Sequence, residues 1–225
     1  MSKYYIMILS QTEENYLKAI YKLAYANANN VSTTMISEAI KTKASSVTDM
    51  IQKLAEKDLV HYKKYQGVSL TEIGQKIAVE IVRKHRLWEV FLLNKLHYNW
   101  DEVHELAEQL EHIKSNTLTD KLEAFLEFPT HDPHGDPIPD KEGNIKHHNN
   151  TMLSSVETGK SCIVIGIKDS SDPFLKFLDK LQIQLGSTLK VVSKEPFDNS
   201  MLVETTTASI SISNQISKNL FVKKL

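Results

Sequence analysis

The stretch TTMISEAIKTKASSVTDMIQKLAEKDLVHYKKYQGVSL, residues 33–70, decides the fold of the first part of the chain. Ser32 is a residue type that caps helices, and it stands directly before a short run with apolar side chains at 35, 36 and 39. Residues 41–43 are expected to form a turn. Apolar positions then share one face of a helix predicted from about Ala44 to Lys57. The stretch therefore opens with two short helices joined by a turn.

The second half of the same stretch predicts a β-hairpin. From Leu59 to Leu70, two strand-like runs flank a turn that contains Gly67 and has lysines near its tip. Upstream, residues 12–25 carry apolar side chains three and four positions apart and predict an amphipathic helix. The order of three helices and a hairpin is that of a winged helix. Residues 1–100 contain fourteen Lys and Arg against nine Asp and Glu, a balance that suits a polyanionic partner.

One long helix is predicted to follow the hairpin. Because no Gly or Pro falls after Gly74, the helix is expected to span Thr71 to Leu96. Its apolar stripe includes Trp88, Phe91 and Leu92. A stripe of this kind indicates packing or dimerisation, so a homodimer is expected.

The remaining pattern changes from helices to strands. Two more helices are expected at residues 100–112 and 115–126, followed by a linker at 128–150 that holds four of the six prolines. A short helix is predicted at residues 173–181. Short strands are predicted at residues 162–167, 189–192, 201–204, 210–212 and 220–222. The chain is thus expected to be mainly α with a small β domain: an N-terminal winged helix-turn-helix, a helical middle and a C-terminal SH3-like β-barrel.

The composition restricts the classes of protein to which the chain can belong. With 225 residues, 41% hydrophobic and 24% charged, it is typical of a soluble globular protein. Neither a signal peptide nor a membrane span is predicted, so we expect a cytoplasmic protein without membrane contact. The single cysteine, Cys162, excludes an intramolecular disulfide framework and a thiolate zinc site. A bound metal is therefore expected to have nitrogen and oxygen ligands.

Histidines and carboxylates cluster at helical spacing in the middle of the chain. Four of the nine histidines lie between positions 85 and 112, and residues 101–150 contain four Lys and Arg against twelve Asp and Glu. One face of the long helix carries His85 and Glu89, and an arc of about 100° on a later helix carries four more such side chains. These four are His104, Glu108, Glu111 and His112. A divalent cation would neutralise their charge, although a solvated acidic face is the alternative.

Four stretches of the chain carry a family resemblance. They are Glu14-Asn15-Tyr16-Leu17-Lys18-Ala19-Ile20-Tyr21, Arg-Lys-His-Arg-Leu at 83–87, Val103-His104 with Glu111-His112, and Asp132-Pro133-His134-Gly135-Asp136-Pro137-Ile138-Pro139. In order and spacing they resemble the DtxR/MntR family of metal-dependent repressors, over nearly the whole chain. The resemblance implies a winged-helix DNA-binding domain in 1–73, a helical metal-binding and dimerisation domain with a Pro-rich linker in 74–150, and an SH3-like domain related to FeoA in 151–225.

The resemblance also implies two metal sites. The primary site would consist of Asn15, Glu108, Glu111 and His112, and the ancillary site of His85, Glu89 and His104. Asn15 stands where relatives usually have Met or Asp, so it would offer a neutral and weaker amide oxygen. Lys18 replaces the carboxylate with which two-domain manganese regulators bridge a close metal pair, which favours two separate sites. Asp169 and Asp172 lie near the place where the third domain of relatives supplies ligands, and no role is assigned to them.

The predicted ligands favour one metal over another. Glu108 stands where the iron-responsive members of the family have cysteine, as it does in the manganese-responsive members. An oxygen-rich site is harder and suits Mn(II) better. Mn(II) is therefore the first choice and Fe(II) the second, with other divalent transition metals as further candidates.

The N-terminus of the helix at residues 44–57 is the candidate reading head for DNA. Short hydroxyl side chains there allow close approach to a major groove, and the helix dipole favours phosphate. The candidates for base edges are Ser45, Ser46 and Asp49, those for phosphates Thr48 and Lys53, and those for the flanking backbone the hairpin residues Lys63 and Lys64. The alternative for each residue is a helix cap or a solvated face.

The patterns point to a DNA-binding protein with a metal site, and the resemblance implies a repressor of metal-ion homeostasis that binds double-stranded operator DNA as a homodimer when loaded with Mn(II). An iron(II)-responsive repressor of the same family is the first alternative. A metalloenzyme whose His/Glu cluster activates water is a second, but the sequence offers it no nucleophile, Gly-rich phosphate loop or assigned base. A metal-independent winged-helix regulator is a third.

Overall fold

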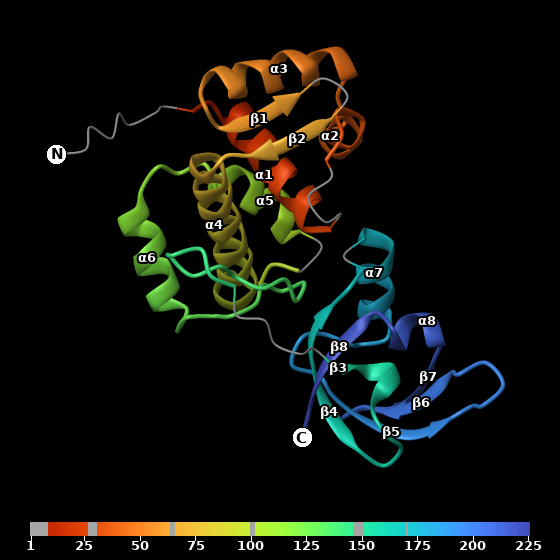
Figure 1. Cartoon of the computed structure of the whole chain (residues 1–225). Coiled ribbons are helices and arrows are strands. Elements are labelled where there is room, and N and C mark those ends of the chain that lie inside the picture. The colour runs from red at the N-terminus through yellow and green to blue at the C-terminus, as the bar shows by residue number, and fades with distance from the viewer. Residues whose placement is uncertain (1–8, 27–30, 64–65, 100–101, 146–150, 170) are drawn as a thin grey trace. The chain divides into compact units, whose positions relative to one another are not determined.

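The structure is a computed structural model that describes residues 9–26, 31–63, 66–99, 102–145, 151–169 and 171–225 (Figure 1). The chain forms two compact units. The first comprises Met1–His85, Gln109–Ser115 and Pro139–Asn144, and the second comprises Arg86–Glu108, Asn116–Ile138 and Ile145–Leu225. Within the described ranges, no helix combines the length and apolarity that crossing a membrane requires.

Three helices and a hairpin open the first unit, as the sequence predicts (Figure 1). They are α1 (Gln11–Ala26), α2 (Thr33–Ile40), α3 (Ala44–Glu56), β1 (Val60–Lys63) and β2 (Gly67–Leu70). Ser32 caps α2, because its side-chain oxygen accepts a hydrogen bond from the N–H of Met35. Lys41 ends α2 in the left-handed conformation, with φ 56°. The predicted winged helix is confirmed.

The core of the winged helix consists of the apolar faces of its elements. Leu17, Ile36, Ile51 and Leu54 are fully buried, and each such side chain contributes about 1.5–3 kcal/mol relative to an exposed one. The hairpin is antiparallel, with Val60 opposite Leu70 and Lys63 opposite Gly67. These contacts fix α3, which exposes its other face, against the rest of the winged helix.

Helix α4 (Glu72–Leu96) starts directly after the hairpin and continues into the second unit. The hydroxyl of Thr71 accepts a hydrogen bond from the N–H of Gly74 and donates one to the carbonyl of Asp58, which joins the start of α4 to the end of α3. Four consecutive charged or polar side chains of α4, residues 83–86, are buried. Since such residues are seldom fully buried without partners, this stretch of α4 indicates a polar site.

Helix α5 (Val103–Leu110) and helix α6 (Asn116–Phe125) follow. The prediction of a helix at 100–112 was wrong at its end, because residues 111–112 form a turn; Trp100 and Asp101 lie outside the described residues. In the second unit, Leu87, Val90, Leu122 and Ile138 form a buried cluster. Trp88 and Phe91 pack against it and meet edge to face, with ring centroids 5.7 Å apart.

The prediction of a linker was wrong for residues 128–138. A β-bridge pairs His131 with Pro137, and the N–H of Ile138 donates to the carbonyl of Thr130. Asp132 and Ile138 are buried. Because prolines fix the backbone angle φ, they favour one folded loop here instead of a flexible connection.

A six-stranded antiparallel sheet, in the order β3-β8-β4-β5-β6-β7, occupies the rest of the second unit (Figure 1). Its strands are β3 (Thr151–Met152), β4 (Ser161–Ile167), β5 (Thr188–Lys194), β6 (Met201–Glu204), β7 (Ser209–Ile212) and β8 (Leu220–Lys224). The accompanying helices are η1 (Leu153–Ser155), α7 (Asp172–Lys180) and α8 (Asn214–Ser217). All five predicted strands and the helix α7 are present. The sequence pattern does not predict β3, because two residues are too short to show an alternation.

Candidate metal centre

Three buried side chains of the second unit form a compact group of potential metal ligands. They are Glu89 on α4 and Asp132 and His134 in the loop at 128–138. One ligand atom from each lies within 4.8 Å of the other two, and the three residues are 1%, 4% and 9% exposed. Two buried carboxylates at this separation disfavour each other's charge, so the arrangement favours a cation.

The backbone of the loop fixes Asp132 relative to His134. One carboxylate oxygen of Asp132 accepts hydrogen bonds from the N–H groups of His134 and Asp136, both at 2.9 Å. The turn passes through Gly135, whose φ of 85° suits glycine. Arg86 on α4 holds the loop from the other side: its guanidinium pairs with Asp132 at 3.5 Å and with Asp136 at 3.2 Å.

The sheet supports the same loop. The N–H of Ile167 on β4 donates to the carbonyl of His134 at 2.9 Å. Gly166 approaches Gly135 so closely that a Cβ on Gly166 would lie 2.5 Å from the Cα of Gly135. Both positions therefore require glycine, and β4 sets the place of the loop that carries Asp132 and His134.

Helix α5 adds His104 to this group. Its Nδ1 lies 3.1 Å from one oxygen of Glu89, and its Nε2 lies 3.6 Å from Glu108. The Nδ1 of His134 lies 3.6 Å from the other oxygen of Glu89. Glu89 therefore stands between two imidazoles, and the side chain of His104, 52% exposed, is the part of the group that solvent reaches.

Burial raises the pKa of Asp132 to about 7, and the neighbouring charges of Glu89 and Asp136 act in the same direction, against the opposing effect of Arg86 and His134. A proton can therefore occupy this carboxyl group near neutral pH. Carboxylate oxygens and imidazole nitrogens are donors that first-row divalent metals such as Mn(II) and Fe(II) accept. The donor set of Glu89, His104, Asp132 and His134 fits such an ion.

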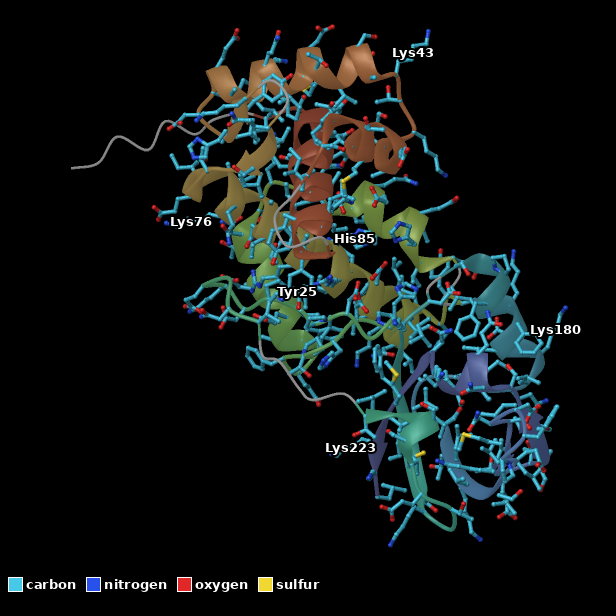
Figure 2. All side chains as sticks on the ribbon, turned by 45° about the vertical axis from the view of Figure 1, so that its right-hand side comes forward. Tyr25, Lys43, Lys76, His85, Lys180 and Lys223 are labelled. Carbon is cyan, nitrogen blue, oxygen red and sulfur yellow. The ribbon has the colours of Figure 1, made fainter. Side chains whose placement is uncertain are left out.

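A second polar group lies in the first unit around Glu111, directly after α5. The Nζ of Lys18 on α1 lies 2.7 and 2.9 Å from its two carboxylate oxygens. The Nδ1 of His85, labelled in Figure 2, lies 2.7 Å from one of them. The side chain of Glu111 is 0% exposed, so these contacts compensate a fully buried carboxylate.

The same segment contacts α1 at a second point. The Nδ1 of His112 lies 2.6 Å from a carboxylate oxygen of Glu14, and the Nζ of Lys114 lies 3.8 Å from the other. Asn15 is the next residue on α1. Its side-chain oxygen is buried and has no hydrogen-bond partner among the described residues. An orphaned oxygen of this kind is compatible with the role of a metal ligand.

The predicted ligands come from both units of the chain. Of the predicted ancillary site, Glu89 and His104 meet in the second unit, and His85 contacts Glu111 in the first. Of the predicted primary site, Asn15, Glu111 and His112 belong to the first unit, whereas Glu108 belongs to the second.

Sequence reasoning missed Asp132, His134 and Glu14. The Asp-Pro-His-Gly-Asp-Pro motif could have indicated Asp132 and His134, but its prolines led to the prediction of a linker. Glu14 gave no separate signal, since the resemblance of its stretch assigned roles only to Asn15 and Lys18. Asp169 accepts a hydrogen bond from the N–H of Ser171 at 2.9 Å.

Helix α3 presents most of the predicted DNA contacts to solvent. Ser45, Ser46, Asp49 and Lys53 are exposed, and so is Lys63 on β1. Lys53 also pairs with Glu13 at 3.1 Å. The hydroxyl of Thr48 already donates to the carbonyl of Ala44. Lys64 lies outside the described residues.

The start of α3 is open to an anion. Lys43, labelled in Figure 2, occupies the N-cap position and makes no side-chain hydrogen bond to the helix. The first N–H groups of α3 therefore have no side-chain cap at this position, and helix N-termini of this kind bind phosphate.

Three family models match consecutive segments of the chain. The N-terminal DNA binding domain of the iron dependent repressors matches residues 8–68, and their metal binding and dimerisation domain matches residues 71–140. The FeoA domain matches residues 151–224.

Individual proteins are similar over large parts of the chain. An uncharacterized HTH-type transcriptional regulator of Methanocaldococcus jannaschii is 34% identical over 119 residues, which are 53% of this chain and 95% of that protein. The iron-dependent repressor IdeR of Mycobacterium tuberculosis is 31% identical over 58% of this chain and 56% of its own length. A solved structure of a manganese-dependent transcriptional repressor in complex with manganese is 35% identical, with a TM-score of 0.73, and the match covers 95% of this chain and 100% of that one.

Proposed function

This chain belongs to the DtxR/MntR family of metal-dependent transcriptional repressors, and from that membership we propose that it responds to Mn(II), with Fe(II) as the second candidate. The chain is a metal-dependent DNA-binding regulator with a dimerisation domain, and it is not an enzyme. We further propose a cytoplasmic location and three domains, at 1–73, 74–150 and 151–225. The matches of the family models to 8–68, 71–140 and 151–224 support that division.

The observation that carries the metal proposal is the buried group of Glu89, Asp132 and His134, with His104 beside it. When bound, the ion supplies the positive charge that lets both carboxylates stay ionised. Glu89 comes from α4, His104 from α5, and Asp132 and His134 from the loop, so holding one ion requires all three segments. The oxygen-rich donor set supports Mn(II), and the manganese named with the similar repressor structure agrees with it.

A second part of the proposal concerns Asn15, His85, Glu108, Glu111 and His112. These residues would take part in metal binding as the family resemblance implies. The contacts of α1 with Glu111 and His112 support a role for this segment in positioning the winged helix. Helix α5 carries His104 and Glu108, and the chain continues from it directly into Glu111 and His112. A change in α5 would therefore reach α1 through residues that contact it.

The operator side of the proposal rests on α3. Ser45, Ser46 and Asp49 would face base edges, Thr48 and Lys53 would contact phosphates, and Lys63 and Lys64 would contact the flanking backbone. The exposure of Ser45, Ser46 and Asp49 supports this assignment. Because the hydroxyl proton of Thr48 is already engaged with Ala44, a phosphate contact by Thr48 would require that bond to open.

The test is operator binding as a function of metal. Double-stranded DNA selected from a random pool by the Mn(II)-loaded protein serves as the probe, and fluorescence anisotropy is measured with Mn(II), Fe(II), Zn(II) or a chelator. We expect the Mn(II)-loaded protein to give the largest anisotropy change at saturating metal and the chelator to abolish binding. Retention of full binding in the chelator would contradict the proposal and favour a metal-independent regulator.

A pair of variants connects the response to the site. His134→Ala removes an imidazole from the buried group and is expected to lose metal-stimulated binding. His97→Asn removes an exposed imidazole at a residue with φ 59°, a conformation that asparagine tolerates, and is expected to bind as the wild type does. Equal operator affinity of both variants in Mn(II) would exclude His134 from the response.

A further inference from the structure

Lys18 and Glu111 form a buried ion pair within the first unit. The ammonium nitrogen lies 2.7 and 2.9 Å from the two carboxylate oxygens, and the side chains are 7% and 0% exposed. His85 contacts one of the same oxygens at 2.7 Å. Both oxygens through which Glu111 would bind a metal ion are therefore already engaged by groups of the chain itself.

An ammonium group in this place does the same electrostatic work as a bound cation. It lies on α1, contacts the carboxylate after α5, and offsets a charge that would be costly to bury alone. A divalent ion on Glu111 would have to displace it, since two cations this close in a buried site repel each other. Lys18 and a metal ion are thus alternatives at the same carboxylate.

We propose that Lys18 is an internal cation that competes with the metal ion for Glu111 and thereby raises the metal concentration at which this segment responds. The inference rests on the proposed function in one respect, that Glu111 is a metal ligand. Lys18 keeps α1 attached to the segment after α5 in the metal-free protein. A metal ion displaces Lys18 from Glu111 only when its concentration is high enough to offset the loss of the ion pair.

Replacing Lys18 is expected to raise the metal affinity of Glu111, because the replacement removes the competing ion pair. In Lys18→Met, the metal-free protein retains a buried Glu111 that contacts two imidazoles, His85 at 2.7 Å and His112 at 3.8 Å, without the ammonium charge. The metal-bound protein loses a neighbouring positive charge. Both effects favour the metal-bound protein. Because breaking a buried pair from one side is strongly destabilising, we expect Mn(II) to bind Glu111 about a hundredfold more tightly.

The experiment measures Mn(II) binding to the full chain by the electron paramagnetic resonance signal of the free ion. All proteins carry His134→Ala, so that the titration reports the Glu111 group. Lys18→Met is compared with Lys57→Met, a matched control that removes a lysine paired with a different buried carboxylate, Glu13 on α1, at 2.6 Å. We expect tighter binding for Lys18→Met alone. Unchanged or weaker binding by folded Lys18→Met overturns the inference.

Two further measurements separate competition from a structural effect. The thermal midpoint of metal-free Lys18→Met should fall and should recover with Mn(II). Lys18→Gln, which keeps a hydrogen-bond donor without the charge, serves if Lys18→Met does not fold, and its affinity should also increase. In a Glu111→Gln background, replacing Lys18 should no longer change Mn(II) affinity. A gain that persists there overturns the inference.

The outcomes also distinguish this inference from the proposed function. If the wild-type chain binds no Mn(II) at all, the proposed function fails and this inference fails with it. If the wild type binds Mn(II) and Lys18→Met in the His134→Ala background binds it no more tightly than its Lys18 parent, only the role of Lys18 is wrong.

Discussion

Glu13 joins three parts of the winged helix at the start of α1. Its carboxylate accepts a hydrogen bond from the N–H of Ser10, and the N–H of Glu13 donates to the Ser10 hydroxyl, which together form a capping box. Lys57 and Lys53, from the end of α3, pair with the same carboxylate at 2.6 and 3.1 Å. Burial disfavours the charge, but the hydrogen bonds from Lys57, Ser10 and Lys53 outweigh it and lower the pKa of Glu13 to about 2.

Glu13→Gln is therefore expected to destabilise the winged helix near neutral pH by about 1–3 kcal/mol, because the buried charged hydrogen bonds are lost. The loss is limited because Lys53 is half exposed and solvent screens its charge. The pKa of Glu13 is lower in the folded protein than its ordinary 4.5, so its stabilisation is complete above that value and is lost as the pH falls towards about 2. Urea unfolding of both proteins across this range measures the difference. Glu72→Gln, which breaks an exposed pair with Lys76, is the control and should change stability little. If the difference in the free energy of unfolding between wild type and Glu13→Gln stays constant down to about pH 2, the charge of Glu13 is not the source of the stabilisation.

The pKa of Asp132 is raised, whereas that of Glu13 is lowered, and the raised pKa links metal binding to pH. Because its folded pKa of about 7 exceeds the ordinary 3.8, the folded protein holds an extra proton between these values, and metal-free stability falls as the pH rises through that range. A proton on Asp132 also competes with a metal ion. We expect Mn(II) affinity to rise between about pH 6 and 7 and then to level off.

Asp132→Asn should remove this pH dependence and weaken Mn(II) binding by at least about tenfold. The amide oxygen can still accept the N–H groups of His134 and Asp136, so the loop should stay folded. Asp140→Asn is the matched control, because Asp140 accepts the N–H groups of Glu142 and Asn144 in a similar turn. Calorimetric Mn(II) titrations at several pH values decide the matter: an Asp132→Asn profile equal to that of the wild type would exclude Asp132 as a ligand.

At the level of residues, helical spacing predicted part of the candidate site. Glu89 and His104 were found because each lies on a helix with a partner four residues away, His85 for Glu89 and Glu108 for His104. Asp132 and His134 approach Glu89 from a loop more than forty positions away, and no periodicity reports such a contact. The ion pair between Lys18 and Glu111 joins positions 93 apart in the chain, so the sequence could show the unusual lysine but not its partner.

Among the secondary-structure elements, α4 depends on a close approach at its first turn. A Cβ on Gly74 would lie 1.9 Å from the carbonyl oxygen of Leu59, a backbone atom that precedes β1. Gly74→Ala therefore forces the start of α4 away from the hairpin. We expect a loss of stability of about 3 kcal/mol, at the upper end for an overpacked position.

Urea unfolding of Gly74→Ala beside Gln75→Ala tests this expectation. Gln75 is the next residue of α4 and is exposed, so its replacement changes helix propensity without changing the contact. If both variants unfold at the same urea concentration as the wild type, the hairpin and α4 do not meet as closely as the structure has them.

Most elements could be predicted because local patterns determine them. The apolar spacing of α1 and α3, the cap at Ser32 and the hairpin around Gly67 each lie within one short window. Residues 128–138 could not, since their prolines resemble those of a linker until Asp132 is seen to accept two backbone N–H groups. The two-residue strand β3 exists only because β8 is beside it.

At the scale of the whole molecule, each unit brings together polar side chains that lie far apart in the sequence. The first unit contains Lys18 and Glu111, and the second contains Glu89, Asp132 and His134. In the second unit the sheet takes part in the candidate site without supplying a ligand from β4. The N–H of Ile167 donates a hydrogen bond to the carbonyl of His134, and the backbone of Gly166 packs closely against Gly135. The C-terminal sheet thereby acts as the support on which the loop is positioned.

Gly166→Ala should accordingly weaken Mn(II) binding although residue 166 is not a ligand. The added Cβ would lie 2.5 Å from the Cα of Gly135, so the loop must move away from β4 and carry Asp132 and His134 with it. Displacing a group that orients ligands costs about tenfold or more in metal affinity. Gly159→Ala controls for general destabilisation: Gly159 lies in the turn before β4, its φ of 84° disfavours alanine, and no atom lies within 4 Å of the added Cβ. Calorimetric titration with Mn(II) should show weaker binding for Gly166→Ala alone. Equal affinities for the two variants would mean that the loop holds its ligands without the sheet.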